Sequence, residues 1–417
     1  PTIVSNSEKV DEYIENLKNA DSTLDEQDVR RHLFSLLKDA NMDAACHHGL
    51  MVTDYSDVKF HKVLFRRLIE NNQRTEAQEL VEKVVDETED EWFSKKRDML
   101  NASVSIPSSL MSLINDPYEV IDESFLLNEV EEFLDGKPTN ESVKYLFNRI
   151  HWKHRRTKIG ANAAEPVWGY LIKEKHMTME ILTRISDLLQ HQGKLGEALE
   201  LLKSSEIISA DHDSEDENLR RKINTIHGML EMLGGNIPEL VPKKGSEKLP
   251  QRVLYLLHNS LPYNSGGYAT RTHGLLSGVR QNDWDIHAVS RYGYPWDRPQ
   301  FKTEENIQEE EIEGIPYHRL PANGDGYGSI PIRDYLIRYS QALVDKCDSL
   351  QPMIIHGASN YMNGFAAVQA AKAIGIPSVY EVRGLWEITR ISKQPEWGET
   401  DFYRYMAHME AWACKEA

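Results

Sequence analysis

Two adjacent glycines, Gly266 and Gly267, stand where a short apolar run gives way to a helical pattern. The apolar run at 253–257 predicts a buried strand, and the spacing of apolar residues over 268–280 predicts a helix. A strand that enters a glycine turn and then a helix directs backbone N–H groups at an anion, and the missing Cβ lets that anion come close. We therefore expect Gly266, Gly267 and Tyr268 to bind a phosphorylated group, and an ordinary turn is the alternative.

Arg271 lies one turn into the same helix, where its guanidinium could clamp a phosphate in a bidentate manner. An ordinary surface position is the alternative for this residue. The glycine pair lacks the third glycine of the G-x-G-x-x-G fingerprint, so a nicotinamide or flavin site fits poorly. This disfavours a nucleotide-dependent epimerase or dehydrogenase.

Polar residues also follow the other apolar runs of this half of the chain. His258 and Asn259 come after 253–257, a loop with Arg291, Trp296 and Asp297 comes after 286–289, and His356 and Asn360 lie at and beyond the end of 353–356. Residues 377–382 form a further strand-like run, which is followed by Arg383 and Glu387. A buried imidazole satisfied by the fold is the competing explanation for each histidine.

Alternating strand and helix patterns tie these residues together. Helical spacing recurs at 268–280, 332–347 and 361–374 between the apolar runs, and residues 312–320 predict an additional strand or hairpin. This alternation predicts βαβ units around a parallel sheet. Ligands of such sheets bind at the carboxyl ends of the strands, so we expect the four polar segments to meet at one edge.

The first part of the chain has a different character. Residues 1–233 predict an all-α domain, with helix pairs at 58–72 and 75–85 and at 178–190 and 195–208. Gly193, Leu195, Ala198 and Leu202 resemble the small-residue pattern of a tetratricopeptide repeat, and a generic helical domain is the alternative. Residues 234–250 contain several prolines and glycines and predict a linker, which leaves 251–417 as the second domain.

Charge and composition exclude several classes of protein. The net charge is −18, and residues 1–250 carry 46 acidic and 32 basic residues, a balance of −14. Such an acidic surface repels phosphodiester backbones and argues against nucleic-acid binding. No apolar run approaches the roughly 18–20 residues of a membrane-spanning helix. The three cysteines are far apart and lack metal-site spacing, which is typical of reduced thiols in a cytosolic protein.

Four segments, taken in order, resemble the N-terminal domain of family-four-like glycosyltransferases. They are Ser-Gly-Gly-Tyr-Ala-Thr-Arg-Thr-His at 265–273, Ser-Arg-Tyr-Gly-Tyr-Pro-Trp-Asp at 290–297, Ile-Ile-His-Gly-Ala-Ser-Asn at 354–360, and the run 375–386. The resemblance implies an α/β Rossmann-like domain, half of a GT-B fold, behind an N-terminal all-α helical domain. It also implies a second, donor-binding domain beyond residue 417, without which we expect the chain to be inactive.

The resemblance implies a metal-independent enzyme, without a cofactor, that moves a sugar from a nucleotide-sugar donor to a carbohydrate or glycolipid acceptor. Gly266, Gly267, Tyr268 and Arg271 would then approach the donor. His258, Asn259, Arg291, Trp296, Asp297, His356 and Asn360 would line the acceptor side, where aromatic faces stack on sugars. The family's roles place such a protein in the cytoplasm, either free or peripheral at the inner membrane.

Arg383 departs from the family, many members of which have a histidine near this strand end. A guanidinium cannot act as a base at neutral pH, but it can stabilise negative charge on a departing diphosphate. We therefore expect Arg383 to bind an anion and Glu387 to pair with it or carry a proton. The alternative is a structural ion pair of Arg383 with Glu381 or Glu387.

A non-catalytic reading stays open at this stage. The helical domain takes up more than half of the chain, so the protein could be an interaction scaffold whose degenerate transferase domain only binds a carbohydrate or a protein. In either reading the helical domain is the expected site for a protein partner.

Overall fold

The computed structural model describes residues 25–38, 41–71, 73–115, 123–154, 158–174, 177–204, 217–243, 247–303, 305 and 307–417. The chain divides into two compact units. The helical unit comprises residues 1–153 and 163–176, and the α/β unit comprises residues 154–162 and 177–417. Residues 1–24 and 205–208, which belong to the predicted helical domain, lie outside the described residues.

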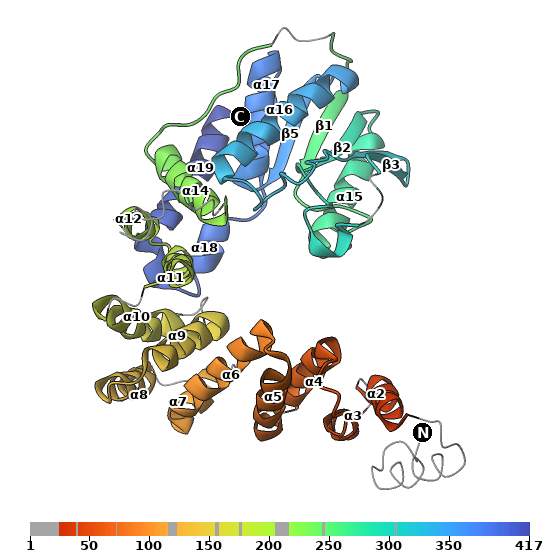
Figure 1. The fold of residues 1–417 in the computed structure, drawn as a ribbon. Coiled ribbons are helices and arrows are strands. Elements are labelled where there is room, and N and C mark those ends of the chain that lie inside the picture. Colours follow the sequence, from red (N-terminus) through yellow and green to blue (C-terminus); the bar gives the residue numbers. More distant parts are fainter. Residues whose placement is uncertain are drawn as a thin grey trace. The chain divides into compact units, whose positions relative to one another are not determined.

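The helical unit consists of consecutive helices that pack mainly on their neighbours in sequence. In order they are α2 (Glu26–Leu37), α3 (Met42–Leu50), α4 (Val58–Glu70), α5 (Arg74–Thr88), α6 (Glu91–Val104), α7 (Ser108–Asn115), α8 (Glu123–Asp135), α9 (Asn140–His154) and α10 (Lys158–Lys173) (Figure 1). Asp57 and Asp90 cap α4 and α6 by accepting the N–H of the third residue that follows each of them. Leu64, Phe65 and Phe93 are buried in the core that α2–α6 share.

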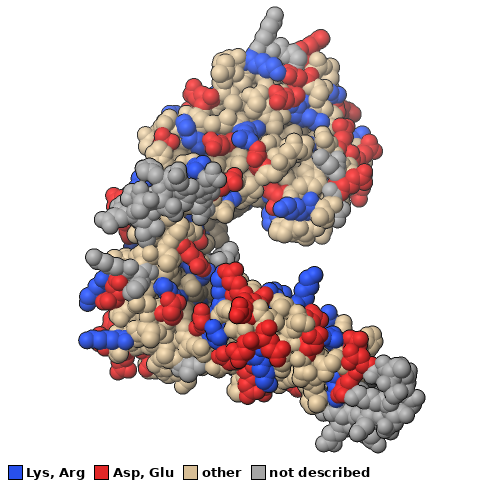
Figure 2. Space-filling view, in the orientation of Figure 1, with Lys and Arg blue, Asp and Glu red and all other residues tan. Residues whose placement is uncertain are grey.

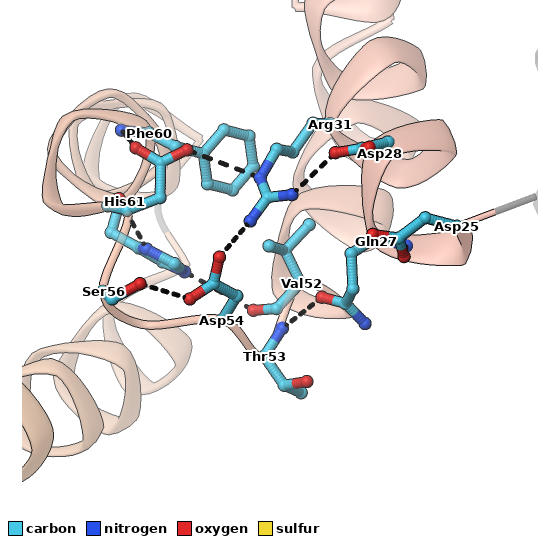
Figure 3. A network of polar contacts seen from close by, with 11 residues as sticks. Asp25, Gln27, Asp28, Arg31, Val52, Thr53, Asp54, Ser56, Phe60 and His61 are labelled. Carbon is cyan, nitrogen blue, oxygen red and sulfur yellow. Dashed lines mark hydrogen bonds and ion pairs between the residues drawn. The ribbon is translucent and has the colours of Figure 1, made fainter.

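A polar network fastens α2 to the connection between α3 and α4 (Figure 3). Arg31 donates to Asp28 at 2.9 Å and to Asp54 at 2.7 Å, and its Nε lies 3.4 Å from Asp57. The Thr53 N–H donates to Gln27 at 2.8 Å. These groups pair with one another, so the network explains a local fold and does not suggest a binding site. Figure 2 shows the predicted acidity, with Asp and Glu side chains gathered over the helical unit.

The α/β unit is built on a six-stranded sheet. Its strands are β1 (Arg252–Leu257), β2 (Asp285–Ser290), β3 (Glu309–Ile312), β4 (Ile315–His318), β5 (Ile354–Ser359) and β6 (Ser378–Val382). Their order in the sheet is β3-β4-β2-β1-β5-β6, with every pair parallel except the β3–β4 hairpin. The predicted parallel sheet and the hairpin at 312–320 are therefore confirmed. Because the chain continues from β1 first to β2 and later to β5 on the other side, β1 marks a topological switch point.

Helices cover the two faces of this sheet unequally. The face that carries Leu254, Leu256 and Ile355 packs against α16 (Ile332–Leu350), α17 (Tyr361–Ile374) and α19 (Asp401–Glu416). The opposite face carries Tyr255, Leu257 and Ala358 and packs against α15 (Gly267–Arg280). Alternation of side chains along each strand produces these two sets. The expected α/β Rossmann-like class with an N-terminal all-helical region is confirmed for the described residues.

The predicted boundary at 234–250 does not coincide with the division into units. Helices α11 (Met179–Gln192), α12 (Leu195–Ser204) and α14 (Glu217–Leu233) belong to the α/β unit. The Phe402 N–H donates to the Gly193 carbonyl at 3.0 Å, and Met232 is fully buried in the core of the sheet. Residues 234–243 are irregular but fixed, since the Lys243 N–H donates to the Ala373 carbonyl at 2.7 Å. Proline and glycine mark irregular backbone here, not a break between compact bodies.

The helix pair around Gly193 forms as predicted. Gly193 ends α11 with a φ of 88°, and the Lys194 N–H donates to the Leu189 carbonyl at 2.8 Å, which closes the helix end. Leu195, Ala198 and Leu202 are fully buried. Whether the pair belongs to a tetratricopeptide repeat stays a prediction. No described helix is long and apolar enough to cross a bilayer.

Candidate active site

The glycine turn lies at the start of α15, as predicted, and is open. Gly266 is the N-cap, and its N–H donates to Asn264 Oδ1 at 2.9 Å. A Cβ on Gly267 would meet no atom within 4 Å. Arg319, which is almost fully buried, donates to Ser260 Oγ and the Leu261 carbonyl at 2.5 Å each and so holds the loop that leads into the turn. The turn therefore offers helix N–H groups to the solvent on a supported loop.

Arg383 follows β6 and lies within a buried polar cluster. Its Nε donates to Glu381 at 2.8 Å, one terminal nitrogen donates to the Tyr255 hydroxyl at 2.7 Å, and the other donates to Thr272 Oγ1. The guanidinium carbon lies 5.2 Å from the centre of the Tyr268 ring. The Arg383 side chain is only 4% exposed, so it bridges protein groups in this structure. The alternative of a Glu381–Arg383 ion pair is what forms, and the contact with a diphosphate stays a prediction.

Glu381 and His356 are the more accessible members of this cluster. Their side chains are 28% and 26% exposed, and His356 Nε2 lies 3.2 Å from Glu381 Oε2. Burial raises the pKa of Glu381, but hydrogen bonds from Arg383 and Tyr255 outweigh it, so the pKa lies below its ordinary value. Burial lowers the pKa of His356. The cluster thus presents a carboxylate beside a neutral imidazole.

His356 was expected at a strand end, and this expectation is wrong. Strand β5 continues to Ser359, so His356 lies mid-strand, opposite Tyr255 of β1 and on the face that α15 covers in part. The two rings have their centres 4.3 Å apart. The glycine after His356 suggested that the strand ends there. Gly357 is needed instead because the helix that follows packs closely against it. A Cβ on Gly357 would lie 2.7 Å from the Asn363 carbonyl oxygen of the helix that follows.

The expected pairing of Glu387 with Arg383 is also wrong. Glu387 lies in α18 (Trp386–Ile391), is 3% exposed, and its Oε2 has no hydrogen-bond partner among the described residues. Its charge acts on Glu410 of α19, which accepts the Tyr361 N–H at 2.9 Å. Burial raises the pKa of Glu410 to about 7, and hydrogen bonds from Tyr380 and the Tyr361 N–H oppose the shift. Arg383 directly follows β6 and pairs with Glu381 of that strand, whereas Glu387 lies in α18 and has other neighbours.

The true carboxyl edge of the sheet brings together residues from three other turns. The Asn360 amide nitrogen lies 3.2 Å from His258 Nδ1, and Arg298 donates to Asn259 Oδ1 at 3.3 Å. The rings of His258 and Trp386 contact edge to face, with centres 5.6 Å apart. Burial, and after it the charges of Arg291 and Arg298, lower the pKa of His258 to about 3. His258, Asn259 and Asn360 are therefore grouped as predicted.

Backbone strain marks the same edge. Ser359, the last residue of β5, has a φ of 103°. This region is costly for a residue with a side chain, and such strain concentrates at functional sites. Asn360 follows directly and caps α17 by accepting the N–H groups of Met362 and Asn363. The strained residue therefore fixes the point where β5 turns into α17, beside His258.

Asp297 and Arg291, which were expected to bind an acceptor, pair with each other. Asp297 accepts from both terminal nitrogens of Arg291, and the side chains are 3% and 2% exposed. Burial would lower the pKa of Arg291, but the hydrogen bond and charge of Asp297 outweigh it, so the guanidinium stays charged. Both groups are almost fully buried, and the carboxylate of Asp297 is taken up by Arg291. Arg271 is exposed and makes no hydrogen bond to the described cluster around Arg383.

A pocket of about 540 Å³ lies between the loops that follow β2 and β4. Residues that line it include Gly293, Trp296, Arg298, Lys302, Ala322 and Gly324. Its size falls within the range of about 300–1,000 Å³ typical of small-molecule sites. Trp296 borders this pocket, and its role in acceptor binding stays a prediction. The Arg383 cluster lies elsewhere, on the sheet face over β1, β5 and β6.

The sequence analysis missed Tyr255 and Lys302. Tyr255 stands inside an apolar run, and only the alternation of Val253, Tyr255 and Leu257 on one face could have indicated that its hydroxyl shares a face with Glu381.

No group of three or more His, Cys, Asp or Glu residues suited to a metal ion occurs among the described residues.

Comparisons with known proteins agree with this geometry for part of the chain. The family model of the glycosyl transferase 4-like domain matches residues 266–417. No curated protein matches the chain. Among solved structures the chain is similar to Haemophilus influenzae LpoA in a monoclinic form, with 10% identity, 88% of this chain and 71% of that chain covered, and a TM-score of 0.17. A score that low supports no conclusion. The family match covers only the C-terminal part of the chain, residues 266–417, and the earlier part is helical.

Proposed function

We propose that this protein transfers a sugar from a nucleotide-sugar donor to a carbohydrate or glycolipid acceptor, and that the α/β unit holds the acceptor side of the site. The observation that carries the proposal is the meeting of polar turns at the carboxyl edge of the sheet. His258 and Asn259 follow β1, Arg298 follows β2, and Asn360 follows β5, with 3.2–3.3 Å contacts between them. Reactants of open α/β sheets bind at such an edge.

The open turn at Gly266 and Gly267 supplies the anion-binding part of the proposal. The donor's diphosphate would approach the first N–H groups of α15, where the positive end of the helix favours negative charge. The diphosphate gains negative charge as the bond between it and the sugar breaks. N–H groups that are already in position to hydrogen-bond this charge lower the barrier. Arg383 acts as a positioning residue in this scheme, because its donors hold Glu381, Tyr255 and Thr272 in place.

A substitution at Gly267 tests the proposal without disturbing the fold. A Cβ on Gly267 meets no protein atom within 4 Å, and the same holds for Gly274 two turns further along α15. Gly267→Val and Gly274→Val therefore form a matched pair that differs in distance from the turn. The assay is release of nucleoside diphosphate from a panel of nucleotide sugars by the protein expressed from its complete reading frame, with Tm measured for each variant.

We expect Gly267→Val to lower kcat/KM by roughly tenfold or more while its Tm stays close to that of Gly274→Val, because the valine side chain would keep an oxyanion away from the first N–H groups of α15. Equal activity of the two variants would remove the turn from the mechanism. Failure of the unsubstituted protein to release diphosphate from any donor, with any acceptor extract, would refute the proposed reaction and favour the scaffold.

A further inference from the structure

The pocket beside Trp296 is positively charged, in a chain whose net charge is −18. Three ionisable residues line it: Asp297, Arg298 and Lys302. The charge of Asp297 is neutralised by Arg291 in a buried ion pair. Arg298 donates to the neutral amide of Asn259, and within the part of the chain that the structure describes neither Arg298 nor Lys302 has a carboxylate partner. The pocket therefore holds a surplus of two positive charges in a protein of net charge −18.

The field of these cations reaches into the carboxyl edge. After burial, the charges of Arg291 and Arg298 are what lowers the pKa of His258. Arg298 therefore adds to the effect of burial and of Arg291 at His258. His258 is neutral and carries no charge of its own. The positive charge of the site therefore comes from Arg298 and Lys302, and it attracts an anion. The pocket and the edge are joined directly through the Arg298–Asn259 hydrogen bond.

The walls of the pocket are built to bring two loops together. Gly293 has a φ of 86°, and a Cβ there would lie 2.9 Å from the Gly326 Cα. A Cβ on Gly326 would lie 2.7 Å from the Asp297 Cβ. Both contacts are closer than side chains allow, so the loops after β2 and β4 meet only because these residues are glycines. The pocket is thus a defined cavity with a fixed wall.

Trp296 gives the pocket its apolar surface. The indole N–H donates to the Glu305 carbonyl at 3.3 Å, so the polar edge of the ring is occupied by the protein. The remaining ring surface is what Trp296 contributes to the lining. An aromatic surface next to cations suits a sugar ring that carries a negative group, because the ring packs on the indole and the anion pairs with the cations.

We propose that this pocket binds an acceptor sugar that carries an anionic group, either a carboxylate or a phosphate. The inference rests on the proposed function, because it assigns the substrate class of the acceptor side of that site. It differs from the expectation for Asp297, since a cationic pocket selects by charge and not by hydroxyl contacts to a carboxylate.

The test is a calorimetric titration of the full chain with methyl glucuronide, glucose 6-phosphate, methyl glucoside and inorganic phosphate. We expect one or both of the anionic sugars to bind at least about tenfold more tightly than the glucoside, as expected for a hydrogen bond to a charged group. The glucuronide and the sugar phosphate distinguish the two sources of charge. Lys302→Glu should abolish the preference, whereas Lys393→Glu, a charge reversal at an exposed lysine outside the pocket, should preserve it.

Equal affinity for the glucoside and both anionic sugars, or the same binding in both lysine variants, would overturn the inference. Inorganic phosphate binding as tightly as either anionic sugar would also overturn it, since the sugar would then contribute nothing. The two proposals fail separately. A protein that binds an anionic sugar but releases no diphosphate contradicts only the reaction, and one that transfers only to neutral acceptors contradicts only this inference.

Discussion

Replacing Asp297 by asparagine tests how the loop after β2 is held. The substitution keeps the shape of the side chain but removes the negative charge that faces Arg291. Arg291 is 2% exposed, and it stays charged in the variant because a guanidinium keeps its proton in proteins. A buried guanidinium without its partner charge costs about 3–5 kcal/mol. We expect the free energy of unfolding of the α/β unit to fall by that amount.

The chain offers an exposed ion pair as a matched control. Asp325 pairs with Arg338, and their side chains are 41% and 51% exposed. Because exposed pairs contribute at most about 1 kcal/mol, Asp325→Asn should change the free energy of unfolding by no more than that. Urea unfolding followed by near-ultraviolet circular dichroism measures both variants. The double variant Arg291→Met with Asp297→Ala should lose less stability than Asp297→Asn alone, since no charge is left unpaired.

A loss below about 1 kcal/mol for Asp297→Asn, equal to that of Asp325→Asn, would refute this reasoning. It would mean that water or another group reaches Arg291 in solution. The proposed positive charge of the pocket would then also be weakened, because it depends on the ion pair between Asp297 and Arg291.

Two further predictions concern packing and pH. Gly357→Ala should lower the free energy of unfolding by roughly 1–3 kcal/mol, because its Cβ would lie 2.7 Å from a helix carbonyl, whereas Gly274→Ala, where nothing lies within 4 Å, should not lower it; similar Tm values for the two contradict the packing. Glu410 has its pKa raised from 4.5 to about 7, so its protonated form stabilises the folded state below pH 4.5, and this contribution is lost as the pH rises to about 7. Glu410→Gln should therefore become more stable relative to the unsubstituted protein between those pH values, as measured by Tm, while Glu416→Gln, with the pKa of Glu416 lowered by Lys372, should show no such gain. A Glu410→Gln difference that is independent of pH would exclude a raised pKa.

The order of the strands and helices in the second half followed from the sequence. Apolar runs at 253–257, 286–289 and 353–356 are typical of strands buried on both faces of a parallel sheet, and helical spacing between them supplies the covering helices. The same reasoning placed the glycine turn at the start of α15 and grouped His258 with Asn360. These features depend on local periodicity and on the common direction of parallel strands, which are both written in the chain.

Only the tertiary structure decided which charges are free. Arg383 and Glu387 are close in sequence, but the start of α18 separates them, and Arg383 pairs with Glu381 two residues back on the same strand face. From the sequence, the charge of Asp297 could bind a ligand, but in the fold Arg291 neutralises it. Whether a charged group faces a ligand or a neighbour depends on loop paths and helix starts, which long-range packing fixes and local patterns do not.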